Sequence, residues 1–224
     1  MPRLHDDTRH DYLGRSGVHD VDTVVDAVVA HEACGPFIAG ELARAVLGPD
    51  VDEGLTRRLG RDFVDAGLQL RPLVRAVLEA GLQGAATSLV QAPVPWLASM
   101  IRATAAPVTA ALAALARGLQ AAGQVPMDAP SVAGWPGGRA WLSSAATVAR
   151  VDLAAALAGL TPTTSPAWSA ASRGDVGALA DALGRPGGFG EATAAALRDA
   201  AGGGRGAATT VLTVAMAAPD SVLV

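Results

Sequence analysis

The sequence predicts an all-α fold, in detail an irregular multi-helix bundle with a Trp-Pro-Gly-Gly loop and a weaker helical tail. Three observations support this prediction. Apolar residues recur at helical spacing in nearly every segment of the 224-residue chain. No stretch alternates apolar and polar residues with the period of two that a half-buried strand requires. Aromatic residues make up only 4% of the chain, so the core must consist mainly of alanine, leucine and valine.

The first part of the chain predicts successive helices separated by Gly and Pro. Valines recur at i, i+3, i+4, i+7 and i+8 over residues 21–29, and Asp20 or Asp22 suits the N-cap. Gly35-Pro36 ends this helix and begins the next. A third helix starts at Asp52, and a fourth contains Pro72 in its first turn. The predicted apolar faces of the last three helices are Phe37, Ile38, Leu42 and Val46, then Leu55, Leu59 and Phe63, then Leu73, Val74, Val77 and Leu78.

Residues 81–91 are predicted to form a loop, after which Pro93 and Pro95 open a helix that continues through Ile101. Pro107 is expected to start a long alanine-rich helix to about residue 122. Residues 123–139 form an irregular connection, and Ser143 or Ser144 can cap a helix that runs to about residue 159. Weaker helices are expected near residues 175–183, 190–200 and 206–217.

These elements predict four regions. Residues 1–20 form a polar leader or loop, and residues 21–160 form a helical core domain. Residues 161–174, which begin with Thr-Pro-Thr-Thr-Ser-Pro, are predicted to be a linker or loop. Residues 175–224 are expected to form carboxy-terminal helices that pack on the core.

Charge and hydropathy exclude several classes of partner. The formal net charge is −4, which predicts no nucleic-acid binding. No apolar run is long enough to span a bilayer, and the polar start of the chain lacks the apolar segment of a signal peptide. The sequence as written therefore predicts a cytoplasmic protein. Its high apolar content predicts an exposed apolar face that binds a protein partner or a second copy of the chain.

The densest cluster of unusual residues lies between Ser131 and Leu142. The turn Gly134-Trp135-Pro136-Gly137-Gly138 precedes Arg139 and Trp141, so two indoles flank a guanidinium that can stack on either ring. If the rings are buried, they anchor an alanine-rich core. If they are exposed, they can stack a sugar or a cation. Arg150 and Asp152 follow in the next helix, and one of them is positioned to reach back to this loop.

Neither a metal site nor a cofactor is predicted. The histidines His5, His10, His19 and His31 lie near acidic residues, but their spacing matches no ligand motif. Cys34 lies in an apolar helical stretch and is interpreted as a buried structural thiol. Gly202–Ala207 has the form Gly-x-Gly-x-x-Ala but lacks a preceding strand, so it is interpreted as a connector.

Several segments together resemble the DUF1800 family of uncharacterised bacterial proteins. They are residues 12–17 followed by 22–26, residues 31–42, residues 130–142, which match most strongly, and residues 216–220, which resemble the usual end of the family's chains. Family members usually carry asparagine at the position of Ser131 and a basic residue at that of Glu41. They are also about twice as long, so the resemblance implies the carboxy-terminal half only, and many full-length relatives are exported.

The resemblance transfers no catalytic residue, because the family has no established activity. The leading hypothesis is a structural or binding component, possibly a fragment of a longer protein. One alternative is part of a hydrolase-like or metal-dependent enzyme that a missing amino-terminal half completes. Another is a carbohydrate-binding module that uses Trp135 and Trp141.

Overall fold

The computed structural model describes residues 8–18 and 20–223, and it confirms a predominantly helical fold. The chain divides into two compact units, residues 1–88 and 89–224. This division differs from the predicted core domain of residues 21–160. The boundary falls within the loop predicted at residues 81–91, where a short π-helical turn, η2 (Gly81–Ala85), leads into extended backbone. Each unit has a hydrophobic cluster of its own, which helical periodicity cannot reveal.

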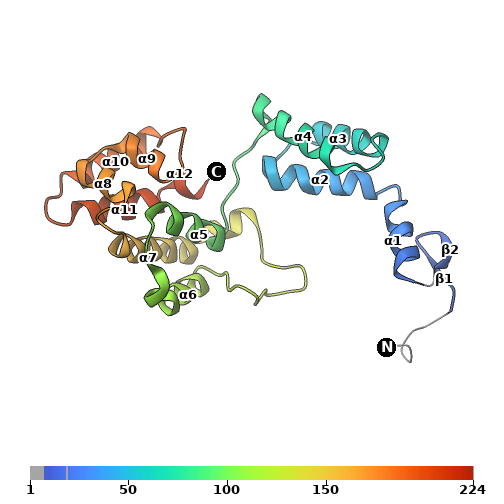
Figure 1. Ribbon diagram of the computed structural model, residues 1–224, viewed down its shortest axis with the longest axis horizontal. Helices are drawn as coiled ribbons and strands as arrows, with labels where there is room; N and C mark the ends of the chain where they lie inside the picture. Colours follow the sequence, from blue (N-terminus) through green and yellow to red (C-terminus); the bar gives the residue numbers. More distant parts are fainter. Residues whose placement is uncertain (1–7, 19, 224) are drawn as a thin grey trace. The chain divides into compact units, whose positions relative to one another are not determined.

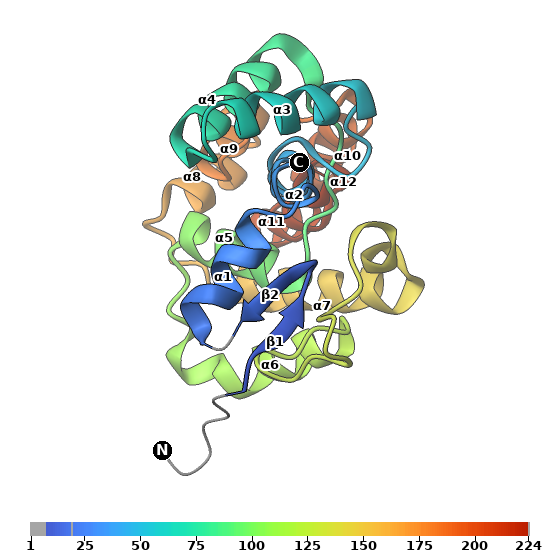
Figure 2. The ribbon, with the colours of Figure 1, turned by 90° about the vertical axis from the view of Figure 1, so that its right-hand side faces the viewer.

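The amino-terminal unit begins with a two-stranded hairpin that packs beside a helix, as Figure 2 shows. The hairpin lies within the predicted polar leader. Its strands pair antiparallel around Leu13 and Gly14, which both have positive φ, at 49° and 75°, as a tight hairpin turn requires. Most of both strands is exposed, so no alternating apolar pattern marks them. The elements of this unit are β1 (His10–Tyr12), β2 (Arg15–Val18), α1 (Val21–Val29), α2 (Cys34–Leu47), α3 (Glu53–Asp65) and α4 (Leu70–Ala80).

Helices α2, α3 and α4 pack side by side (Figure 1). Residues 55, 59 and 63 of α3 are buried as predicted, and Asp52 caps the helix by accepting a hydrogen bond from the Leu55 backbone N–H at 2.7 Å. On α4, Leu73 and Val77 are buried, whereas Val74 and Leu78 are exposed. The predicted stripe therefore marks the core-facing side of α3, whereas only two of the four residues of the predicted α4 face, Leu73 and Val77, are buried.

Three of the four residues of the predicted face of α2 are wrong. Phe37, Ile38 and Val46 are exposed, Leu42 is half-buried against the core, and the helix buries mainly the opposite side. That side approaches α3 so closely that a Cβ added at Gly60 would lie 3.0 Å from the Cα of Pro36. Only small side chains fit along most of this contact, so α2 turns its large apolar residues outward. The buried residues of α2 are Gly35, Ala39, Gly40, Ala43 and Leu47.

The carboxy-terminal unit packs around α11, which contacts α7, α8 and α10 (Figure 1). Trp96 on α5 is fully buried, and its Nε1–H donates to the backbone carbonyl of Met216 on α11 at 3.1 Å. The elements are α5 (Pro93–Thr104), η3 (Val108–Ala111), α6 (Leu112–Ala121), η4 (Gly138–Leu142), α7 (Ser144–Leu160), α8 (Pro166–Arg173), α9 (Val176–Ala182), α10 (Glu191–Ala201), α11 (Ala207–Ala217) and α12 (Pro219–Val222).

Two further elements differ from the prediction. The linker predicted at residues 161–174 contains α8, because Ser165 accepts from the Trp168 N–H at 3.1 Å and Pro166 occupies the first turn. The helix predicted from Pro107 starts as the 3-10 turn η3 and becomes α-helical only at α6.

The predicted cap of α7 is confirmed, since Ser143 Oγ accepts from the Ala146 N–H at 3.2 Å.

None of the helices in the described part of the chain has the length and apolar character that crossing a membrane demands.

The close approach of α2 and α3 predicts opposite effects for two helical Gly→Ala substitutions. Gly60→Ala should lower the free energy of unfolding by about 1–3 kcal/mol, because its Cβ meets the rigid backbone of Pro36. Gly159→Ala in α7 has nothing within 4 Å of its Cβ and should raise stability by about 0.5–1 kcal/mol. Urea unfolding followed by circular dichroism measures both changes, and equal effects would contradict the close contact.

Candidate functional site

The loop singled out in the sequence buries one tryptophan and leaves the other partly exposed. Trp141 lies within η4 at 5% exposure and packs beside Gly123, whereas Trp135 is half-buried. Gly134 and Gly138 have φ values of 89° and 57°, which favour glycine. Trp141 is therefore an anchor, and the two rings do not form an open stacking surface.

Arg139, the guanidinium predicted to stack between these rings, is exposed. Arg150 on α7 is buried at 3% exposure instead, because it shares the inward face of α7 with Ala146, Ala149 and Leu153. From the sequence, Arg150 or Asp152 is expected to reach the loop. Asp152 is exposed, and Arg150 reaches the backbone of Gln91. Its position on a mostly buried helical face was the signal that could have identified it.

The Arg150 guanidinium has one protein acceptor and one aromatic neighbour. Its Nη2 donates to the Gln91 carbonyl at 2.6 Å, and its Cζ lies 5.6 Å from the centroid of the Trp96 ring. Nε and Nη1 are buried and have no acceptor among the described residues. Burial lowers the pKa of Arg150 below the ordinary arginine value, yet arginine stays charged in proteins.

A cavity of about 280 Å³ lies beside Arg150 within the carboxy-terminal unit. Apart from Arg150 and the Thr147 hydroxyl, its walls are apolar side chains. The segment from α12 to Leu223 forms one wall. A backbone hydrogen bond joins this wall to Gln91, just before α5 begins. The Gln91 N–H donates to the Val222 carbonyl at 2.8 Å. The lining residues are Trp141, Leu142, Thr147, Arg150, Ala217, Pro219, Val222 and Leu223.

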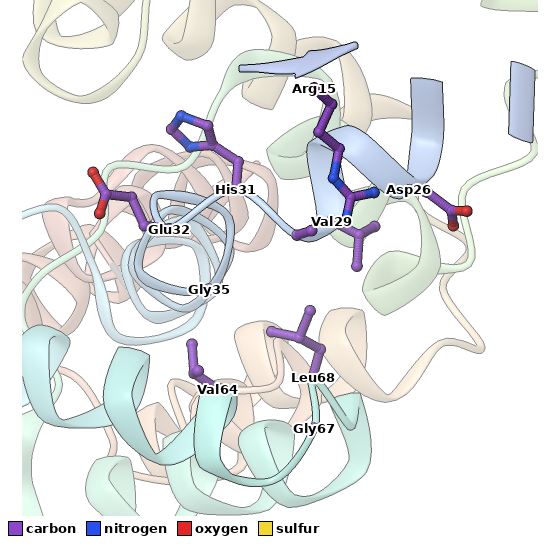
Figure 3. A pocket seen from close by; sticks show the side chains of 10 residues that line it. Arg15, Asp26, Val29, His31, Glu32, Gly35, Val64, Gly67 and Leu68 are labelled. Carbon is purple, nitrogen blue, oxygen red and sulfur yellow. The ribbon is translucent and has the colours of Figure 1, made fainter. Parts of the chain in front are cut away.

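An open hollow of about 710 Å³ lies in the amino-terminal unit, between the end of α1, the start of α2 and the end of α3. Figure 3 shows Val29, Val64 and Leu68 pointing toward one another across it. The charged residues of its rim diverge, with His31 and Glu32 on one side and Arg15 and Asp26 on the other (Figure 3). The hollow therefore offers an apolar surface with a charged rim.

Helix α1 continues this apolar surface. Its capping box is formed by Asp20 and Thr23, with the Thr23 N–H donating to Asp20 Oδ1 at 2.8 Å, which confirms the predicted cap. Ala27 is its only buried residue, while its valines face outward. We call this surface the valine face: Val21, Val24, Val25, Val28 and Val29, whose exposed fractions run from 37% to 76%.

The remaining residues singled out in the sequence do not converge. No group of three potential metal ligands occurs within residues 8–18 and 20–223. His10 lies within 3.1 Å of the Thr8 hydroxyl, and the Ala33 N–H donates to His31 Nδ1 at 3.2 Å. His5 and His19 lie outside the described residues. Cys34 is half-buried at the start of α2, and Gly202–Ala207 connects α10 to α11.

Comparison with known proteins gives one match. The family model described as "Protein of unknown function (DUF1800)" matches residues 1–223. No curated protein and no solved structure shows significant similarity to the chain.

The unequal burial of the two tryptophans predicts unequal effects on stability. Trp141→Ala should lower the free energy of unfolding by about 3–5 kcal/mol, because it empties a buried site. Trp135→Ala should cost less than about 1 kcal/mol, because its ring is partly in solvent. Guanidinium unfolding curves measure both values, and an equal loss for the two variants would contradict the single-anchor interpretation.

The surroundings of the Asp220 carboxylate predict that the attachment of α12 is sensitive to acid. Hydrogen bonds from Thr193 Oγ1 and from the backbone N–H groups of Gly190 and Asp220, together with the charge of Arg185, lower the pKa of Asp220, against an opposing effect of burial. A lowered folded-state pKa gives stability that is present above the unfolded value of about 3.9 and lost as the pH falls below it.

Asp220→Asn should therefore cost about 1 kcal/mol at pH 7 and progressively less below pH 4. Urea unfolding at pH 7 and pH 3 measures the difference. A cost that is the same at both pH values would contradict a charge-dependent attachment.

Proposed function

The chain belongs to the DUF1800 family of proteins of unknown function, and from this premise we propose that it is a binding component that docks a partner protein on its amino-terminal unit. The supporting observation is the orientation of α1. A surface helix normally turns its apolar stripe toward the core, but α1 packs through Ala27 and presents its valines to the solvent.

The energetics of this orientation favour a docking role. Fully burying a valine side chain contributes about 1.5 kcal/mol or more, so a partner that covers the valine face gains several such contributions. Large contiguous apolar surfaces on soluble proteins mark interaction sites. The face also has a concave end, because Val29 belongs both to it and to the hollow that Val64 and Leu68 complete. A helix laid along α1 can therefore insert one apolar side chain into the hollow.

The charges beside the apolar surface define the partner. Asp22 and Asp26 flank the valine face on α1, and Glu32 lies on the rim of the hollow, with Arg15 as the basic residue of that rim. The surroundings are thus mainly acidic. We infer that the partner presents an apolar helix flanked by basic side chains, which complements this pattern. Acidic flanks repel anionic lipid headgroups, so a membrane surface fits less well.

The enzyme and carbohydrate-binding alternatives lack comparable support. The titratable groups of the hollow diverge (Figure 3), so they do not form an acid–base pair around one point. The two tryptophans present no common open surface, because Trp141 is buried. Neither alternative accounts for the outward valines of α1.

Synthetic helical peptides test the proposal. Two peptides of equal length carry the same stripe of leucines. In one peptide arginines flank the stripe, and in the other glutamates flank it. The full chain should bind the arginine peptide at least about tenfold more tightly, and added salt should weaken that binding. The double variant Val25→Asp with Val28→Asp should reduce binding at least about tenfold, because docking would bury unpaired charges. Fluorescence anisotropy measures each affinity.

A matched control lies on α7, where Val148 and Val151 have the same i, i+3 spacing and similar exposure, 61% and 42% against 51% and 40% for Val25 and Val28. Val148→Asp with Val151→Asp should leave peptide binding unchanged. Equal affinity for both peptides, or equal losses in both double variants, would contradict the proposal. A wild-type dimer in sedimentation that the Val25/Val28 variant abolishes would identify a second copy as the occupant instead.

A further inference from the structure

Among the described residues of the carboxy-terminal unit, Arg150 is a buried cation without a neighbouring carboxylate. Arg150 is 3% exposed, and it forms no ion pair with any acidic side chain of the described residues. A guanidinium carries five N–H donors, and one of its nitrogens, Nη2, donates to the Gln91 carbonyl. Burying an unpaired charge is costly unless an anion or sufficient acceptors surround it. Arg150 therefore provides unused donors and an uncompensated positive charge.

Arg150 lines a cavity whose other walls are mostly apolar. Its volume of about 280 Å³ lies just below the usual range of ligand pockets, which is about 300 to 1,000 Å³, so it suits a small ligand. Trp141, Leu142, Val222 and Leu223 contribute apolar walls. The Thr147 hydroxyl already donates to the Ser143 carbonyl at 3.0 Å, so the oxygen that remains there is an acceptor. Arg150 is therefore the cationic group of this cavity.

We infer that this cavity is a binding site for a small aliphatic monocarboxylate, with the carboxylate on Arg150 and the hydrocarbon chain against Trp141 and Val222. A planar guanidinium can bind a carboxylate through two parallel hydrogen bonds. One cation balances one negative charge, so a dianionic phosphate or dicarboxylate would carry a second charge into apolar surroundings. This site lies outside the amino-terminal unit, and its test is independent of the protein docking proposed above.

The position of Arg150 is held independently of any ligand. The Gln91 carbonyl accepts from Nη2, and the Trp96 ring covers one side of the guanidinium. The wall formed by α12 is held by the Gln91–Val222 hydrogen bond, by Arg185, whose Nη2 donates to the Ser221 carbonyl at 2.9 Å, and by the acceptor role of Asp220. The site is thus preorganised, which lowers the entropic cost of binding.

Calorimetric titration of the full chain with sodium octanoate, 1-octanol and the dicarboxylate suberate tests the assignment. Octanoate should bind with a stoichiometry of one, and at least about tenfold more tightly than octanol or suberate, because only octanoate supplies a single charge and a single apolar chain. Arg150→Gln should remove the preference for octanoate over octanol. Arg139→Gln, which removes an exposed arginine from the same region, should leave it unchanged.

A second variant covers the case in which Arg150→Gln fails to fold, which its circular dichroism melt will show. Ala217→Phe fills the cavity from its half-buried wall and should weaken octanoate and octanol alike. Absence of octanoate binding to the folded chain, or equal wild-type affinity for octanoate and octanol, would overturn the inference. So would unchanged octanoate binding in Ala217→Phe. Tighter binding of a short peptide with a free Val-Leu carboxyl terminus would overturn it in favour of a peptide ligand.

Discussion

The fold depends on the close approach of helices through glycine and alanine. Gly60 meets the backbone of Pro36 where α3 crosses the start of α2, and Gly118 on α6 lies directly against Leu153 on α7. The buried faces of α7 and α8 are also rich in alanine. The distance between packed helices is set by the side chains at their contact, and small residues bring the axes close. Such contacts leave little space for large apolar side chains between the helices.

This constraint explains where the large apolar residues lie. In the amino-terminal unit α2 packs through its small residues, so Phe37 and Ile38 face outward, and α1 packs through Ala27, so its valines do the same. The outward apolar residues of α1 and α2 are thus a consequence of helix contacts that are made mainly through small side chains. In the carboxy-terminal unit, Trp96 and Trp141 fill volume that alanine leaves, and the cavity beside Trp141 remains where the filling is incomplete.

Arg150 connects the packing of the carboxy-terminal unit to its chemistry. Its position on the inward face of α7 brings a charge into an apolar interior, which a purely structural design would avoid. The Trp96 ring and the Gln91 carbonyl satisfy the guanidinium in part. Because the Gln91 N–H also donates to the Val222 carbonyl, the backbone of Gln91 holds both the Arg150 guanidinium and the wall of the cavity. The polar group and the apolar cavity are therefore parts of one arrangement.

The sequence by itself determined the helical class, most helix positions and the caps at Asp20 and Ser143, because these depend on interactions within a few residues. It also singled out the segment around Trp141 as locally unusual in composition. The tertiary structure decided which face of α2 is buried, where the chain divides into units, and that Arg150 rather than Arg139 is the buried guanidinium. Periodicity shows that a helix has an apolar face, but the shape and volume of the neighbouring helix decide which face it buries.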